Sequence, residues 1–109
     1  MPRDAGLPPG TLNLIILRVL RAGPLHGYAI ARKIQVLSKD ELQVEEGSLY
    51  PALQKLLVKG FVKAEWDVSD TGRKVRIYRL TPAGRKQLET EMAEFRRTTF
   101  AIENIIETA

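Results

Sequence analysis

The sequence predicts a mainly α-helical fold with a small β-hairpin, followed by a long C-terminal helix. Apolar residues recur at helical spacing through the first 60 residues, which predicts three helices. Beyond Gly60 the pattern changes to two segments rich in aromatic and β-branched residues on either side of a turn, as in a hairpin. The last segment repeats apolar residues at intervals of three and four, which is typical of a helix. With 109 residues and 44% hydrophobic content, the chain suits one globular domain.

The first two predicted helices are defined by their end signals and by an apolar face. Thr11 follows a lead-in that contains prolines and a glycine, and it can cap the first helix. Gly23 and Pro24 end that helix, because proline cannot continue the hydrogen-bond ladder. We expect a second helix at 26–37 and then a loop with a short strand at 42–44. The apolar faces comprise Leu12, Ile15, Ile16, Val19 and Leu20 in the first helix and Ile30, Ile34 and Leu37 in the second.

A proline inside the third apolar segment, EEGSLYPALQKLLVKGFV at 45–62, raises the question of where this helix begins. If Gly47 or Ser48 caps the helix, Pro51 lies in its first turn, where its missing N–H would have had no intrahelical partner. The proline would then cost little and would fix the helix start. The inward face comprises Leu49, Ala52, Leu53, Leu56 and Leu57, and the end signal is Gly60.

The predicted hairpin consists of FVKAEWDV at 61–68 and KVRIYRL at 74–80. The intervening SDTGR supplies the aspartate and glycine that turns favour. Basic residues flank its tip, so we expect a ribbon with a basic end to project from the body. These residues are Arg73, Lys74 and Arg76.

The last predicted helix opens at Thr81-Pro82, a cap followed by proline at the first helical position. It can run nearly to the end of the chain. A series of residues, apolar except for one threonine, is spaced four, three, four, three and four, which is a heptad-like seam. We predict that this seam contacts a second chain, because the preceding helices and hairpin have enough apolar residues to close their own core. The seam comprises Leu88, Met92, Phe95, Thr99, Ile102 and Ile106.

The order of these elements is that of a winged helix-turn-helix with a long C-terminal dimerisation helix. We therefore divide the chain into a flexible lead-in at 1–10, a winged-helix DNA-binding domain at 11–81 and a dimerisation helix at 82–109. In such modules the third helix enters the major groove and a basic hairpin tip reaches phosphates or the minor groove. Double-stranded DNA is thus the expected partner, together with a second copy of the chain.

The candidate DNA contacts are the residues that remain outside once the leucines of the third helix turn inward. Hydroxyls and a lysine there can contact phosphates, helped by the positive end of the helix dipole, and glutamine can read an adenine edge. Tyr28 of the second helix could contact phosphate or pack against a neighbouring helix. The full set is Tyr28, Ser48, Tyr50, Pro51, Gln54, Lys55, Arg73, Lys74 and Arg76.

Charge is distributed unevenly along the chain. Residues 61–88 carry seven Lys or Arg against three Asp or Glu, whereas residues 89–109 carry two against five. A basic body with an acidic final segment favours a polyanionic partner for one surface only. The pI near 9.6 does not by itself establish a polyanionic partner, since many proteins with such a pI bind nothing anionic.

The sequence also resembles the PadR family of transcriptional regulators. The motifs that carry the resemblance are PLHGYAI at 24–30, GSLYPAL at 47–53, GFV at 60–62 and YRLTPAG at 78–84. They occur in the family's order and cover most of residues 12–88. Ala29 departs from the pattern, because many relatives have an acidic residue after the Gly-Tyr pair. The single long helix after the hairpin is similar to the smaller subgroup of the family.

The resemblance implies a homodimeric winged-helix repressor whose last helix supplies dimer contacts. Relatives detect small hydrophobic or phenolic molecules, in some cases in a cavity between subunits. Phe95 and Phe100 could line such an effector pocket, although the simpler interpretation places both in the dimer core.

Other functions find less support in the sequence. One histidine and no cysteine leave only scattered carboxylates, so we expect no enzyme, no metal and no cofactor. No apolar run approaches the roughly 20 residues of a membrane span, and the N-terminal residues lack the pattern of a signal peptide, so we expect a cytoplasmic protein. The alternative is a winged-helix module for protein binding, which predicts an apolar outer face on the third helix. We expect Trp66 to pack against the body rather than to sense a ligand.

Overall fold

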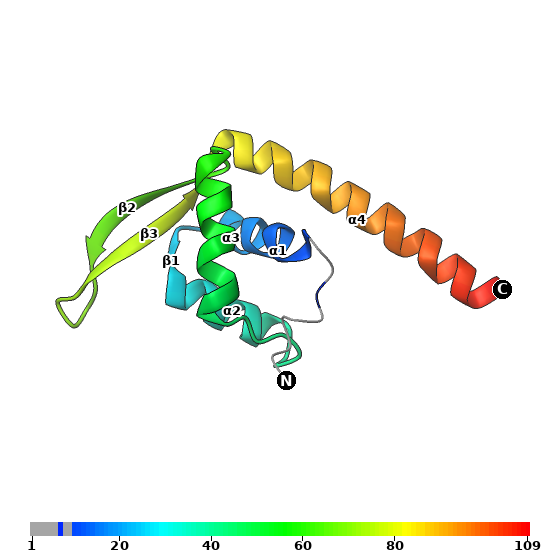
Figure 1. Cartoon of the computed structure of the whole chain (residues 1–109), viewed down its shortest axis with the longest axis horizontal. Helices are drawn as coiled ribbons and strands as arrows, with labels where there is room; N and C mark the ends of the chain where they lie inside the picture. The colour runs from blue at the N-terminus through cyan, green and yellow to red at the C-terminus, as the bar shows by residue number, and fades with distance from the viewer. Residues whose placement is uncertain (1–6, 8–9) are drawn as a thin grey trace.

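The computed structural model of the chain describes residue 7 and residues 10–109. Its elements are α1 (Thr11–Arg21), β1 (Leu25–His26), α2 (Gly27–Leu37), α3 (Glu46–Val58), β2 (Val62–Val68), β3 (Lys74–Leu80) and α4 (Pro82–Thr108). This order confirms the mainly α-helical fold with a small hairpin. The predicted lead-in at 1–10 lies almost entirely outside the described residues. In Figure 1 the hairpin and the C-terminal half of α4 project in opposite directions from a body formed by α1, α2 and α3.

The core forms where the apolar faces of α1, α2 and α3 meet the base of the hairpin and the start of α4. The predicted faces of α1 and α3 supply most of it, and Leu88 of α4 is fully buried there as well. Leu37 departs from the prediction, since 65% of its side chain is exposed. It is the last residue of α2 and lines an open groove beside α4 instead of entering the core.

The sheet has three antiparallel strands in the order β1-β3-β2. The predicted strand at 42–44 is wrong, because this segment is a loop. Val44 is buried and Leu42 packs against the core, so their alternation reflects insertion of a loop rather than strand pairing. The Leu42 N–H donates to the Ser38 hydroxyl at 3.0 Å. The third strand is instead Leu25–His26, which pairs with β3.

Two helices begin at residues other than those predicted. Gly10, with φ 85°, is the N-cap of α1, so Thr11 is already helical. Glu45 is the N-cap of α3, and the N–H of Leu49 donates to its carbonyl oxygen at 2.9 Å. Pro51 therefore lies in the second turn of α3 rather than the first, and the carbonyl of Gly47 lacks its usual helical donor. Both residues are exposed, so water can satisfy this carbonyl.

The start of α4 is as predicted. The Thr81 hydroxyl accepts from the Gly84 N–H at 3.0 Å and donates to the Gly60 carbonyl at 2.7 Å, with Pro82 at the first helical position. This pair of bonds ties the helix to the end of α3. The helix then runs to Thr108, and an ion pair of 3.2 Å between Arg21 and Glu89 links it to α1.

The predicted apolar seam of α4 divides into two parts. Leu88 is fully buried in its own domain, and Met92 packs against the same core. Leu88 is therefore a core residue without surface for a second chain. The remaining seam residues, which are exposed, are Phe95, Thr99, Ile102 and Ile106.

The long helix also determines the shape of the molecule. The radius of gyration is 15.2 Å, above the roughly 13 Å of a compact domain of this length. The excess arises because the distal half of α4 extends away from the body (Figure 1). No helix in the described part of the chain is both long and apolar enough to cross a membrane.

Candidate nucleic-acid interface

The outer face of α3 carries a polar stripe. Because Leu49, Ala52, Leu53 and Leu56 are buried, the opposite side of α3 faces solvent. Four of the predicted contacts are exposed there, three of them at the i, i+3, i+7 spacing of one helical face. We call these four residues the outer stripe: Ser48, Pro51, Gln54 and Lys55.

Tyr50 lies away from the outer stripe, against the start of α2. Its phenol covers Gly27: a Cβ built at that glycine would lie 2.6 Å from the Tyr50 hydroxyl oxygen. The side chain is still 42% exposed, so it both packs and remains accessible. Partial burial, then the nearby Glu46 carboxylate and Tyr78, raise the pKa of Tyr50 above its usual value. Its hydroxyl is therefore a neutral hydrogen-bond donor at pH 7.

The hairpin, residues 62–80, forms the wing. Its turn is closed by hydrogen bonds from the Ser69 N–H to the Arg73 carbonyl at 2.8 Å and from the Gly72 N–H to the Ser69 carbonyl at 2.9 Å. Gly72 has φ 82°, which favours glycine at this position. The ordered turn presents Arg73 and Lys74 at the tip, both exposed.

Trp66 does not pack against the body, contrary to our expectation. The residue is 68% exposed and lies directly opposite Arg76 in the pairing of β2 with β3. The Arg76 guanidinium carbon lies 5.7 Å from the centroid of the Trp66 ring and 5.8 Å from that of Tyr78. Both distances fall within the range of a cation–π contact.

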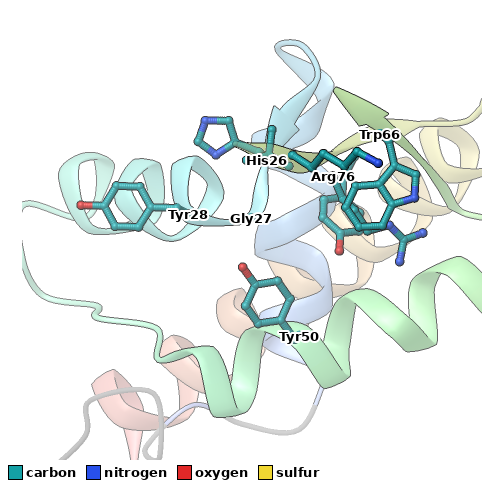
Figure 2. A pocket seen from close by; sticks show the side chains of 9 residues that line it. His26, Gly27, Tyr28, Tyr50, Trp66 and Arg76 are labelled. Atoms are coloured by element: carbon teal, nitrogen blue, oxygen red, sulfur yellow. The ribbon is translucent and has the colours of Figure 1, made fainter. Parts of the chain in front are cut away.

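These side chains line a cleft between α2, α3 and the wing. Its volume is about 250 Å³. Figure 2 shows Tyr50 rising from α3 toward Gly27, with Trp66 and Arg76 on the wing side. We call this the wing cleft; its lining residues are His26, Gly27, Tyr28, Tyr50, Trp66, Lys74, Val75, Arg76 and Tyr78.

The wing cleft unites only part of the predicted set. It brings together Tyr28, Tyr50, Lys74 and Arg76. The outer stripe and Arg73 lie outside it. The five other lining residues were not predicted as contacts: His26, Gly27, Trp66, Val75 and Tyr78. Alternation along β3 could have found Tyr78, which shares a face with Arg76, whereas Trp66 joins that face only through the register of β2 with β3.

The chemistry of the wing cleft and outer stripe is that of hydrogen-bond donors and cations. Tyrosine hydroxyls, an ammonium group and a guanidinium group suit a polyanion. Within residues 7 and 10–109, no group of three or more His, Cys, Asp or Glu side chains could hold a metal ion.

The two phenylalanines predicted to share an effector pocket do not do so within one chain. Phe95 lines two grooves beside α1 and α4, of about 660 and 400 Å³. Phe100 lines neither groove and is 69% exposed. It lies five residues further along α4, about 140° around the helix axis.

Known proteins share both the sequence pattern and the fold. The pattern of the transcriptional regulator PadR-like family matches residues 16–90. The transcriptional regulator Rv3488 of Mycobacterium tuberculosis is 40% identical over 77 residues, which cover 71% of this chain and 68% of that protein. A transcriptional regulator from Clostridium thermocellum superimposes with a TM-score of 0.80 at 28% identity, covering 87% of this chain and 92% of the other.

A further solved structure contains DNA. Bacillus subtilis PadR in complex with operator DNA superimposes with a TM-score of 0.68 at 28% identity. The match covers 75% of this chain but only 46% of that protein. The family pattern spans more than half of the chain and includes α3 and the wing. The chain therefore belongs to the PadR-like family of transcriptional regulators.

Proposed function

We propose that this regulator is a repressor that binds an inverted-repeat operator as a homodimer. The observation that carries the proposal is the exposed outer stripe of α3 together with a basic wing, with the wing cleft between α3 and the wing. The operator complex of B. subtilis PadR supports it, because that relative shares the fold of these elements. A repressor of this kind acts in the cytoplasm by denying polymerase access to the DNA.

Each element has a distinct role on the operator. Helix α3 enters the major groove, where Gln54 can read an adenine edge and Lys55 can contact phosphate. The wing places Arg73 and Lys74 on the flanking backbone. Two such domains related by a two-fold axis would occupy half-sites about one helical turn, roughly 34 Å, apart.

The proposed dimer forms through the distal half of α4. A helix that projects from the body with large exposed apolar side chains favours a partner that covers them. Ile105, 63% exposed, joins the predicted seam residues on this surface. The large exposed apolar residues of α4 are Phe95, Phe100, Ile102, Ile105 and Ile106.

A small aromatic or hydrophobic effector could release the operator. The support for this is the position of Phe95 on the two grooves beside α1. The dimer core remains the simpler role for Phe95, whereas Phe100 lies on the face of α4 opposite the seam. A thermal-shift screen of aromatic acids and apolar compounds separates the two roles, since a ligand that binds the native dimer raises its Tm.

The alternative function is protein binding by the winged fold without sequence-specific DNA recognition. That function favours an apolar outer face on α3. The outer stripe instead contains a hydroxyl, an amide and an ammonium group. The stripe therefore favours DNA.

In vitro selection from a random duplex library, at moderate salt to suppress non-specific phosphate binding, tests the proposal. We expect an inverted repeat with half-sites about one helical turn apart. Gln54→Ala should relax the preference at one base pair in each half-site, whereas Lys55→Ala should weaken binding to all sequences alike. Recovery of no consensus, with binding lost as salt rises, would refute specific repression and favour the protein-binding alternative.

A further inference from the structure

Two arginines of β3 differ in whether they have a carboxylate partner. Arg79, on the opposite face of β3, forms a 2.9 Å ion pair with Glu65. Among the described residues no carboxylate forms an ion pair with Arg76, whose guanidinium lies against Trp66 and Tyr78. The face of the wing that borders the cleft therefore keeps its positive charge.

The two rings restrict where this charge can lie. Arginine loses rotamer freedom when it binds, and a contact that already orders the side chain lowers that cost. Tyr78 is 4% exposed and fixed in the sheet, whereas Trp66 is 68% exposed. Because the Trp66 ring remains in solvent, it contributes little hydrophobic free energy to folding. We therefore assign it the role of holding the Arg76 guanidinium above it.

The guanidinium is held beside the proposed recognition helix. The wing cleft has Tyr50 of α3 and Tyr28 of α2 on one side and Trp66, Lys74 and Arg76 on the other. With α3 in the major groove and the wing against the flanking backbone, the strand that borders the groove passes between α3 and the wing. That space is the wing cleft.

We propose that the wing cleft binds the sugar–phosphate backbone of the operator and that Arg76, positioned by Trp66, donates to one of its phosphates. The inference rests on the proposed function and extends it to a specific site. Arg76 is the DNA contact, and Trp66 is a positioning residue that acts through it. The Tyr50 hydroxyl and the ammonium group of Lys74 border the same cleft.

A free aromatic anion is the competing occupant, since rings and cations would suit it as well. The charge distribution favours DNA. The basic residues continue from Arg76 through Lys74 to Arg73 at the tip of the wing, and Arg73 does not line the cleft. A row of cations that extends beyond the cleft matches a polymer of phosphates better than one small carboxylate.

Salt-dependent DNA binding tests the role of Arg76. Affinity for a fluorescein-labelled duplex carrying the selected repeat is measured by anisotropy at several salt concentrations. Arg76→Ala should reduce the slope of log K against log salt by about one for each protomer. Arg79→Ala is the matched control, because it removes the same charge from the same strand on the face already neutralised by Glu65. Equal slopes for the two variants would overturn the assignment.

A double-mutant cycle tests whether Trp66 acts through Arg76. Trp66→Ala should weaken binding about two- to fivefold per half-site, the range of an exposed cation–π contact. In the Arg76→Ala background the same change should cost less than about twofold, because the group it positions is absent. An undiminished loss in that background would show that Trp66 acts independently and would contradict the positioning role. Circular dichroism of each variant establishes that it is folded.

Trp66 also provides a direct probe, because it is the only tryptophan in the chain. Its emission should change on saturation with duplex DNA and remain unchanged with benzoate alone. The reverse result would assign the cleft to a small aromatic anion and overturn the proposal.

Failure of the cleft assignment and failure of the proposed function give different experimental results. If selection yields no consensus, a random duplex at low salt still reports on the cleft, since phosphate contacts do not depend on sequence. Anisotropy that shows binding while Trp66 emission stays constant refutes the cleft assignment alone. Absence of any DNA binding refutes both the cleft assignment and the proposed function.

Discussion

At position 27 a side chain would require the phenol of Tyr50 to move, because that ring occupies the space where one would begin. A Cβ there would lie 2.6 Å from the Tyr50 hydroxyl oxygen and 2.9 Å from Cε1. The φ angle of Gly27 is not among the positive ones, so space rather than backbone conformation requires the glycine. One contact thus joins the start of α2 to α3 and closes one side of the wing cleft.

Gly27→Ala should therefore either displace Tyr50 or overpack the junction, at a cost of about 1–3 kcal/mol in unfolding free energy. Tyr50→Ala in the same background should remove most of that cost, because the two residues share one contact. Urea denaturation of the single and double variants measures both effects. Gly47→Ala serves as the stability control, since nothing lies within 4 Å of a Cβ at that exposed helical position. Additive losses at positions 27 and 50 would contradict this account.

At the scale of elements, local signals were predictable from the sequence and long-range ones were not. The cap at Thr81 with Pro82 depends on neighbours in sequence, and the structure has it as predicted. The strand Leu25–His26 has too few residues to show alternation, and it exists because β3, some fifty residues later, offers it an edge. The start of α3 was misplaced because Glu45, an uncommon N-cap residue, takes that position.

The same distinction between local and long-range signals applies to the candidate site. The outer stripe could be predicted, because helical periodicity alone separates Ser48 and Lys55 from the buried leucines. The role of Trp66 could not, because it depends on the register that places Arg76 opposite it. Exposure of so large a ring also runs against the usual expectation for tryptophan.

The junction of α4 with the wing is a second element-scale feature that depends on one glycine. A Cβ at Gly84 would overlap the Phe61 carbonyl oxygen at 1.9 Å and approach the Leu80 side chain at 2.8 Å. The Phe61 carbonyl already accepts from the Thr81 N–H at 3.1 Å. Neither this carbonyl nor the first turn of α4 can therefore move freely. The first turn of α4 is thereby held against the base of the hairpin.

Gly84→Ala should destabilise the protein by about 3 kcal/mol or more, because backbone must shift to accept the methyl group. The Tm should fall by roughly 10 °C or more for a domain of this size. Thermal unfolding followed by circular dichroism measures the loss. Ala83→Gly, at the exposed neighbour, should cost no more than about 1 kcal/mol. A Tm for Gly84→Ala within a degree of the unchanged chain would refute the role given to this contact.

At the scale of the whole molecule, two parts of the chain that project from the body differ in charge. The wing and the distal half of α4 point away from the body in opposite directions (Figure 1). The basic segment comprises the wing and the start of α4, and the acidic segment is the rest of the chain: residues 61–88 carry seven cations against three acids, and residues 89–109 carry two against five. An acidic helix is repelled by DNA, so the proposed dimer contacts lie on the part of the chain least suited to bind it.

Ile102→Glu combined with Ile106→Glu should convert the proposed dimer to a monomer without unfolding it. Both side chains are at least half exposed in the single chain, whereas Leu88 and Met92 pack against the domain core and are retained. Two carboxylates in an apolar seam would be desolvated without partners, so association fails. Sedimentation velocity should show the monomer, and affinity for the full operator should fall by about 10²-fold or more as bivalency is lost.

Affinity for a single half-site should persist in this double variant, because α3 and the wing are unchanged. Asn104→Glu is the matched control: it adds a carboxylate to the same helix about 160° around the axis from Ile102. That variant should remain dimeric and bind the full operator normally. If instead the double variant remains a dimer while Asn104→Glu dissociates, the opposite face of α4, which carries Phe100, forms the interface. The seam would then be free to line an effector site.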